Sequence, residues 1–256
     1  MPSSLRHSSW SQCIGLVALI LAAPVIGGEP TGRALAVGAV AGIVGAVGVT
    51  LFYQGLSQGT MSVVAPVAAL LSAAVPVVVG VGGGERPDPM ALAGIGLALV
   101  AITLVSREGP GSDSGSVSRL KSRALVLALA AGLAFGLFFV IVDTAGSGSG
   151  IWSLVAARTA SVSLFGGLGA AGIMAAAPPR RDVAVTAAGA GVLDAVANVF
   201  YVLALSHGLL TVVSVLTTLY PVGTVLLARY VLGETMTRGQ QAGLTVAGAA
   251  TLLIAT

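Results

Sequence analysis

Residues 62–87 read SVVAPVAALLSAAVPVVVGVGGGERP, and no charged residue occurs in this stretch before Glu85. An α-helix of about 20 mostly apolar residues is long enough to cross the hydrocarbon core of a bilayer. The strand of a membrane β-barrel is about half as long and alternates apolar with polar residues. Because this run is longer and continuously apolar, it predicts a membrane-spanning helix.

The rest of the chain has the same character. Of its 256 residues, 56% are hydrophobic and 8% are charged, and the mean hydropathy is +1.01. Soluble domains carry about 25% charged residues, so this chain could not cover a water-facing surface. We therefore expect an all-α integral membrane protein with about nine spans. The predicted spans are 11–28, 33–54, 60–81, 89–106, 123–142, 151–177, 183–205, 209–232 and 238–256.

One long polar stretch interrupts the apolar runs. Residues 107–121 read REGPGSDSGSVSRLK, a composition typical of a flexible linker. It separates four predicted spans from five. We therefore expect a first repeat at 1–106, a linker at 107–121 and a second repeat at 122–256.

The two halves match each other without gaps at a shift of 149 residues. At this shift Gly84-Glu85 aligns with Gly233-Glu234, and Ala93-Gly94 aligns with Ala242-Gly243. Further matches are Ser57 with Ser206, Gly59 with Gly208, Val63-Val64 with Val212-Val213, Leu70 with Leu219, Leu104 with Leu253 and, at a shift of 148, Phe52-Tyr53 with Phe200-Tyr201. The first half has no counterpart of the span at 123–142. The pattern predicts an inverted repeat of four plus five helices, whose first helix is absent through truncation, a late start or evolutionary loss.

The chain resembles the EamA family of the drug/metabolite transporter superfamily. The resemblance rests on residues 62–87, on LVS at 104–106, and on LTTLYPVGTVLLARYVLGETMTRGQQAGLTVAGAATLLIA at 216–255. It implies ten helices in two inverted five-helix repeats and the export of small metabolites. We therefore expect a secondary transporter that works by alternating access in the cytoplasmic membrane of the cell. The alternative is a non-transporting membrane scaffold or an incomplete transporter remnant.

Asp194 is the residue that most strongly indicates a transport site. It lies near the middle of a predicted span, where a charged side chain costs about 2.5–3.5 kcal/mol unless it faces protein or water. Asn198 and Tyr201 follow on the same helix face. Thr50 and Tyr53 align with these two residues in the first half, and Tyr220 could add a polar group. These six residues are candidates for substrate contact or proton coupling; the alternative is an interhelical hydrogen-bond cluster.

Prolines and glutamates mark further candidate positions. Pro66, Pro76 and Pro221 lie inside predicted spans, where a proline frees a carbonyl and bends or breaks the helix. Glu85 and Glu234 end equivalent spans, which favours either gating contacts or interfacial anchoring and capping of the next helix. Arg158 lies near the start of its span, and we expect its side chain to reach water.

Several classes of protein are excluded by what the sequence lacks. The single cysteine, Cys13, rules out an internal disulfide, and no pattern indicates a metal site, a cofactor or an enzyme's catalytic group. The basic residues are scattered, so nucleic acid is not an expected partner. The expected partners are a small-molecule substrate and the lipid bilayer. The glycine-rich helix faces at 38–45 and 132–136 are expected to be packing surfaces, and they are also compatible with a homodimer.

Overall fold

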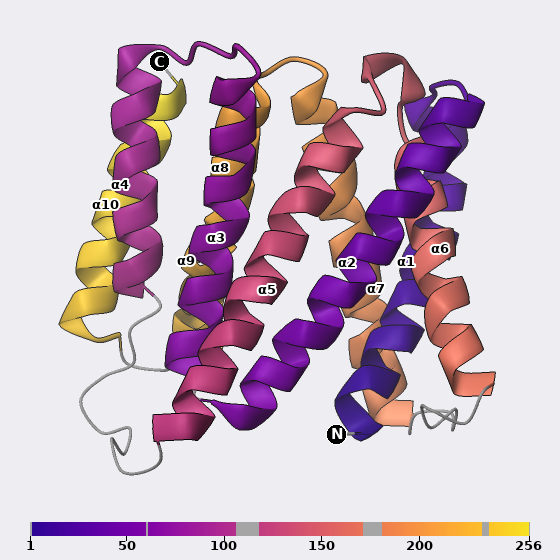
Figure 1. Ribbon diagram of the computed structural model, residues 1–256, viewed down its shortest axis with the longest axis horizontal. Helices are drawn as coiled ribbons and strands as arrows, with labels where there is room; N and C mark the ends of the chain where they lie inside the picture. Colours follow the sequence, from indigo (N-terminus) through magenta and orange to yellow (C-terminus); the bar gives the residue numbers. More distant parts are fainter. Residues whose placement is uncertain (1, 60, 106–117, 171–180, 232–235, 256) are drawn as a thin grey trace. The chain divides into compact units, whose positions relative to one another are not determined.

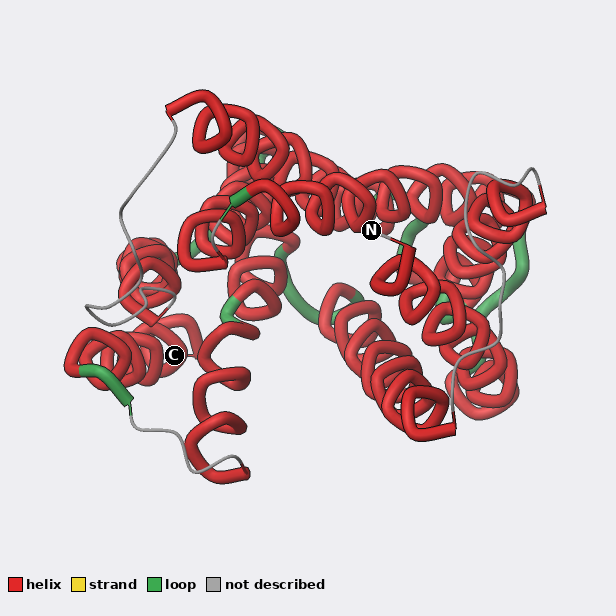
Figure 2. Tube along the Cα trace, turned by 90° about the horizontal axis from the view of Figure 1, so that it is seen from below, coloured by secondary structure: helices red, strands yellow, loops and turns green. Residues whose placement is uncertain are grey.

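The computed structural model describes residues 2–59, 61–105, 118–170, 181–231 and 236–255, and within them every regular element is helical (Figures 1 and 2). The α-helices of the described chain are α1 (Pro2–Ile26), α2 (Gly32–Gln58), α3 (Met61–Gly82), α4 (Pro89–Val105), α5 (Ser118–Asp143), α6 (Trp152–Ala170), α7 (Arg181–Leu205), α8 (Leu210–Thr218), α9 (Tyr220–Val231) and α10 (Arg238–Ala255). A short 3-10 helix, η1, covers Ser147–Ser149.

The predicted spans coincide with these helices, and the ends generally agree within a few residues. Three differences are clear. Helix α1 begins at Pro2, nine residues before the start of the predicted span at 11–28. The predicted span at 209–232 is divided at Leu219 into α8 and α9. In addition, α5 begins at Ser118, inside the predicted linker, and residues 106–117 lie outside the described chain. By length and composition, four described stretches can cross a membrane: Gly32–Gln58, Val64–Gly82, Arg123–Asp143 and Ala187–Leu205.

The chain forms two compact units, and each takes helices from both sequence halves. Unit 1 comprises Met1–Tyr53 and Leu137–His207, and unit 2 comprises Gln54–Gly136 and Gly208–Thr256. Unit 1 therefore contains α1, α6 and α7 with most of α2 and the end of α5. Unit 2 contains α3, α4, α8, α9 and α10 with most of α5.

Glycines allow close helix packing within unit 1. A Cβ atom at Gly38 would lie 2.9 Å from the Cβ atom of Ala156, and one at Gly42 would lie 2.7 Å from the Cα atom of Ala157. Only glycine permits α2 and α6 to approach this closely. The Ser161 hydroxyl also donates to the Gly42 carbonyl at 3.0 Å. Close approach with interhelical hydrogen bonding is typical of membrane helices, because lipid provides no hydrophobic drive for their association.

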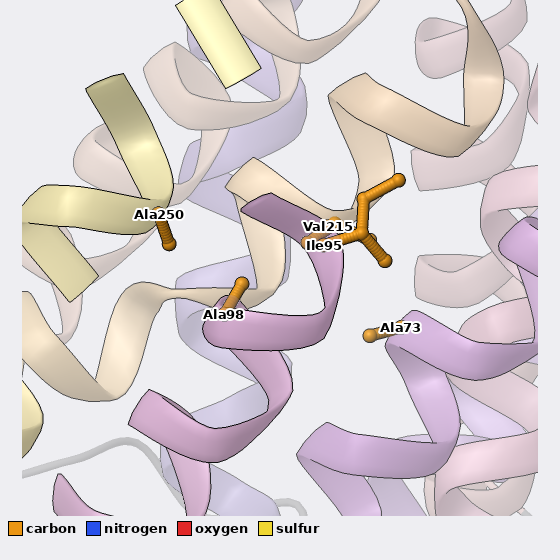
Figure 3. Packing of buried hydrophobic residues seen from close by; sticks show 5 residues of the cluster. All are labelled: Ala73, Ile95, Ala98, Val215 and Ala250. Atoms are coloured by element: carbon orange, nitrogen blue, oxygen red, sulfur yellow. The ribbon is translucent and has the colours of Figure 1, made fainter. Parts of the chain in front are cut away.

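Unit 2 is organised around an apolar core and the antiparallel helix pair α4–α10. The core consists of small and branched side chains from α3, α4, α8 and α10, namely Ala73, Ile95, Ala98, Val215 and Ala250 (Figure 3). In the α4–α10 pair, a Cβ atom at Gly94 would lie 2.9 Å from the Ala250 carbonyl oxygen. At the other end of the pair, Gly239 lies beside Leu104, so the two helices run in opposite directions.

Candidate functional site

An ion pair in unit 1 joins two helices at the position of the predicted intramembrane acid. Arg158 of α6 donates from Nη2 to Oδ2 of Asp194 on α7. Its second terminal nitrogen, Nη1, donates to Oε1 of Gln12 on α1. The Arg158 side chain is 13% exposed and that of Asp194 is 49% exposed. The arginine is thus mostly enclosed, whereas the carboxylate remains accessible.

Two glycines make this three-helix junction possible. A Cβ atom at Gly15 of α1 would lie 3.1 Å from the Gly191 carbonyl oxygen of α7 and 3.6 Å from Nε of Arg158. A Cβ atom at Gly191 would in turn meet the backbone of Ser11. Because both positions lack side chains, α1 and α7 cross at short range and leave room for the guanidinium beside them.

The polar stripe predicted on α7 divides into three different environments. Asn198 donates from Nδ2 to the Asp194 backbone carbonyl at 2.8 Å, a bond within its own helix. Tyr201 is 3% exposed, its hydroxyl donates to the Phe139 carbonyl at 3.3 Å, and the two rings lie 4.8 Å apart. Tyr201 therefore fastens α7 to the end of α5. Only Asp194 of the three combines a charge with accessibility.

The candidates on α2 are in the same unit as the ion pair. The Thr50 hydroxyl donates to the Ala46 carbonyl at 2.8 Å, so it is occupied by its own helix backbone. Tyr53 is 37% exposed, and its ring lies 6.2 Å from that of Phe52. Within the described part of the chain, no hydrogen bond connects the side chain of Thr50 or Tyr53 with Asp194.

The prolines of unit 2 have different effects on their helices. Helix α3 continues through Pro66 and Pro76, both of which are buried, so these two prolines do not end the helix. Neighbouring helices can stabilise a proline-containing helix within a membrane. The second half differs, because the helix is interrupted at Leu219 and resumes at Tyr220, next to Pro221. Tyr220 is 54% exposed at the start of α9.

Of the two predicted glutamates, Glu85 lies within the described residues and Glu234 lies outside them. Glu85 follows α3, and its carboxylate accepts hydrogen bonds from the first turn of α8. It therefore does not cap the next helix along the chain. That helix, α4, is capped by Asp88, whose Oδ1 accepts from the Met90 amide at 2.8 Å.

Arg158 and Gln12 are the site residues that the sequence analysis missed. The expectation that Arg158 reaches water is wrong, because its guanidinium turns toward Asp194 and Gln12. A signal was available, since an acid in the middle of a span needs a counter-charge and Arg158 is a basic residue inside another span. Gln12 has no comparable signal, because an amide near a helix end is compatible with many roles.

Comparison with known proteins agrees with the helical membrane architecture. The model of the EamA-like transporter family matches residues 3–107 and 122–256. One solved structure, described only as a crystal structure of a protein, is 17% identical to the chain. The alignment covers 100% of this chain and 88% of the other, with a TM-score of 0.76, which establishes a shared fold. None of the curated proteins matches the chain.

Proposed function

The chain belongs to the EamA-like transporter family, and from this premise we propose that it is a secondary transporter that exports small metabolites across the cytoplasmic membrane by alternating access. Membership makes it a drug/metabolite transporter-type membrane protein. Export, the class of substrate and the alternating cycle are our proposal.

The observation that carries this proposal is the Arg158–Asp194 pair. A pair whose sole role was to hold helices together would be best enclosed on both sides, because exposure to water weakens the attraction between charges. Here the Arg158 side chain is 13% exposed but the Asp194 side chain is 49% exposed. Asp194 can therefore meet a substrate group or a proton while Arg158 remains in place.

Gln12, the second partner of Arg158, allows Asp194 to exchange partners. When a proton or a substrate group engages Asp194, its attraction for Arg158 weakens. An unpaired buried guanidinium would be costly, but Gln12 still accepts one of its hydrogen bonds. Arg158 is then retained at the junction, and Asp194 can exchange partners without a buried charge losing every contact.

An inverted repeat is the architecture that we propose around this site. Support comes from the helices that the repeat makes equivalent. Helix α4 runs antiparallel to α10, its equivalent in the second repeat, and the end of α3 meets the start of α8. Both arrangements are expected for sequence repeats of opposite orientation. With α8 and α9 counted as one interrupted span, the chain would have nine spans, in repeats at 1–106 and 122–256.

Metabolite profiling tests the proposed function directly. The medium of cells that express the chain is compared with that of cells that express Asp194→Asn or the control Glu29→Gln, which changes an exposed loop acid of unit 1. We expect one or more metabolites to accumulate outside with the parent and the control, and to fall at least tenfold with Asp194→Asn. Full export with unaltered pH dependence in Asp194→Asn would exclude a role for this carboxylate.

A further inference from the structure

The carboxylate of Glu85 holds the first turn of a helix that is distant in sequence. Its Oε1 accepts from the Leu210 amide at 2.7 Å, and its Oε2 accepts from the Thr211 amide at 2.9 Å. The Thr211 hydroxyl also donates to Oε2. Leu209, at the N-cap position of α8, provides no side-chain cap. One carboxylate thus accepts hydrogen bonds from two amides that have no partner within α8. Its negative charge is also stabilised by the positive end of the α8 helix dipole.

The backbone at the end of α3 is shaped to admit this carboxylate. A Cβ atom at Gly80 would lie 2.9 Å from Cδ of Glu85 and would also meet the Thr211 hydroxyl. The Glu85 amide donates to the Gly80 carbonyl at 2.9 Å, which turns the chain back over the helix end. Gly80 and Thr211 are both buried. The contact therefore occupies a built site that a side chain at position 80 would fill.

This contact differs from the apolar packing in the rest of unit 2. Around Gly80, the valines of α3 are turned outward: Val78 is 70% exposed, Val79 42% and Val81 45%. The apolar core lies farther along the helices, at Ala73 of α3 and Val215 of α8. At the end of α3, the hydrogen bonds of Glu85 to Leu210 and Thr211 add a polar attachment to α8. The apolar side chains Leu210 and Val213 of α8 are buried beside these polar groups.

We propose that Glu85 and the first turn of α8 form a clasp that closes one end of unit 2 and must open during transport. In this role Glu85 is a positioning residue, because it acts through α8. The inference rests on the proposed alternating access. Opening exchanges three hydrogen bonds for bonds to water and pivots α8 about the apolar core.

Cysteine accessibility at the two ends of unit 2 tests the clasp. Cys13→Ser provides a cysteine-free chain, and single reporters are then introduced as Leu209→Cys, beside the clasp, or Gln241→Cys, at the exposed start of α10. Because α10 begins at the opposite end of unit 2, the reporters sample both ends. The full chain is placed in nanodiscs, and the rate of reaction with a polar maleimide is measured.

Two sets of variants separate the hydroxyl from the carboxylate. Glu85→Gln keeps the shape but presents amide hydrogens where α8 needs an acceptor. Thr211→Val removes the hydroxyl, and Thr211→Ser retains it as the matched control. For Glu85→Gln we expect labelling to rise about tenfold at position 209 and to fall at 241, because the two ends of an alternating transporter do not open together. Thr211→Val should shift both rates in the same directions by a smaller factor, and Thr211→Ser should match the parent.

Two results would overturn the clasp. Unchanged labelling at position 209 in Glu85→Gln and Thr211→Val would show that the contact does not hold this end closed. A rise at 209 without a fall at 241 would show that Glu85 is a static cap. If Glu85→Gln does not fold, the Thr211→Val and Thr211→Ser pair decides. The assay needs no substrate, so it can fail while the Asp194→Asn export test succeeds, and the reverse also holds.

Discussion

The closest helix approach in unit 1 provides a quantitative test of the packing. In the variant Gly42→Ala, the new Cβ atom would lie 2.6 Å from the carbonyl carbon and 2.7 Å from the Cα atom of Ala157. Non-bonded carbon atoms are normally about 3.5–4.0 Å apart, so α2 and α6 would have to separate by about 1 Å. The obstacle is backbone, which cannot rotate away.

The magnitude follows from two losses and one gain. Overpacking costs about 1–3 kcal/mol. Separation would also stretch the Ser161 hydrogen bond to the Gly42 carbonyl, now 3.0 Å, which is worth at most about 0.5–1.5 kcal/mol because the same hydroxyl also lies 2.9 Å from the Ala157 carbonyl of its own helix. Alanine regains about 1 kcal/mol through its higher helix propensity. We expect a net loss of about 1–3 kcal/mol, which corresponds to a Tm lower by roughly 2–12 °C for a chain of this size.

Thermal unfolding of the purified protein in detergent measures this change. The chain has two tryptophans, Trp10 on α1 and Trp152 on α6. In a Trp10→Phe background, tryptophan fluorescence reports on the helix that must move, and circular dichroism follows overall helicity. The control is Gly96→Ala on α4, where an added Cβ atom meets nothing within 4 Å. We expect the control to keep or slightly raise the parental Tm. A parental Tm for Gly42→Ala, or an equal fall for both variants, would refute the packing argument.

Two further substitutions test the polar contacts of unit 1. Arg158→Lys keeps the charge, but an ammonium group cannot reproduce the planar fork that reaches Gln12 and Asp194 together. We expect a folded protein with export at least tenfold lower, and near-parental export would argue against the pair as the transport site. Tyr201→Phe removes the hydrogen bond to the Phe139 carbonyl, so stability should fall by about 0.5–1.5 kcal/mol in thermal unfolding. Export should continue in Tyr201→Phe because Tyr201 is only 3% exposed. A loss of export in this variant would instead indicate that the Tyr201 hydroxyl lies in the transport path.

The positions of the helices could be predicted because a bilayer leaves few alternatives. An apolar run of about 20 residues must satisfy its backbone groups internally, and polar loops then fix its ends. Helices α2, α3 and α7 begin and end within a few residues of the predicted bounds. It could not locate the contacts between helices. The Arg158–Asp194 pair depends on the crossing of α1 and α7 at Gly15 and Gly191, which has no marker in a chain with 36 glycines.

Helical periodicity alone also could not separate Asp194 from Tyr201. Seven residues are close to two turns, so the two side chains point in nearly the same direction from α7. They are nevertheless about 10 Å apart along the axis, since each residue advances the helix by 1.5 Å. At the level of Tyr201 the end of α5 covers the helix, whereas at the level of Asp194 α6 supplies Arg158. The face of a helix could be predicted, but its neighbours at each level could not.

The difference between α3 and the α8–α9 segment follows from one aligned position. At the shift of 149 residues, Pro221 aligns with Ser72 of α3. A serine keeps its backbone amide for the helix, and the Ser72 hydroxyl donates to the Ala69 carbonyl at 2.9 Å. A proline has no amide hydrogen to donate to the carbonyl four residues earlier, which here belongs to Thr217. The helix is interrupted at Leu219, within two residues of that proline. The two aligned segments therefore differ in continuity, because α3 is one helix whereas its counterpart is divided into α8 and α9.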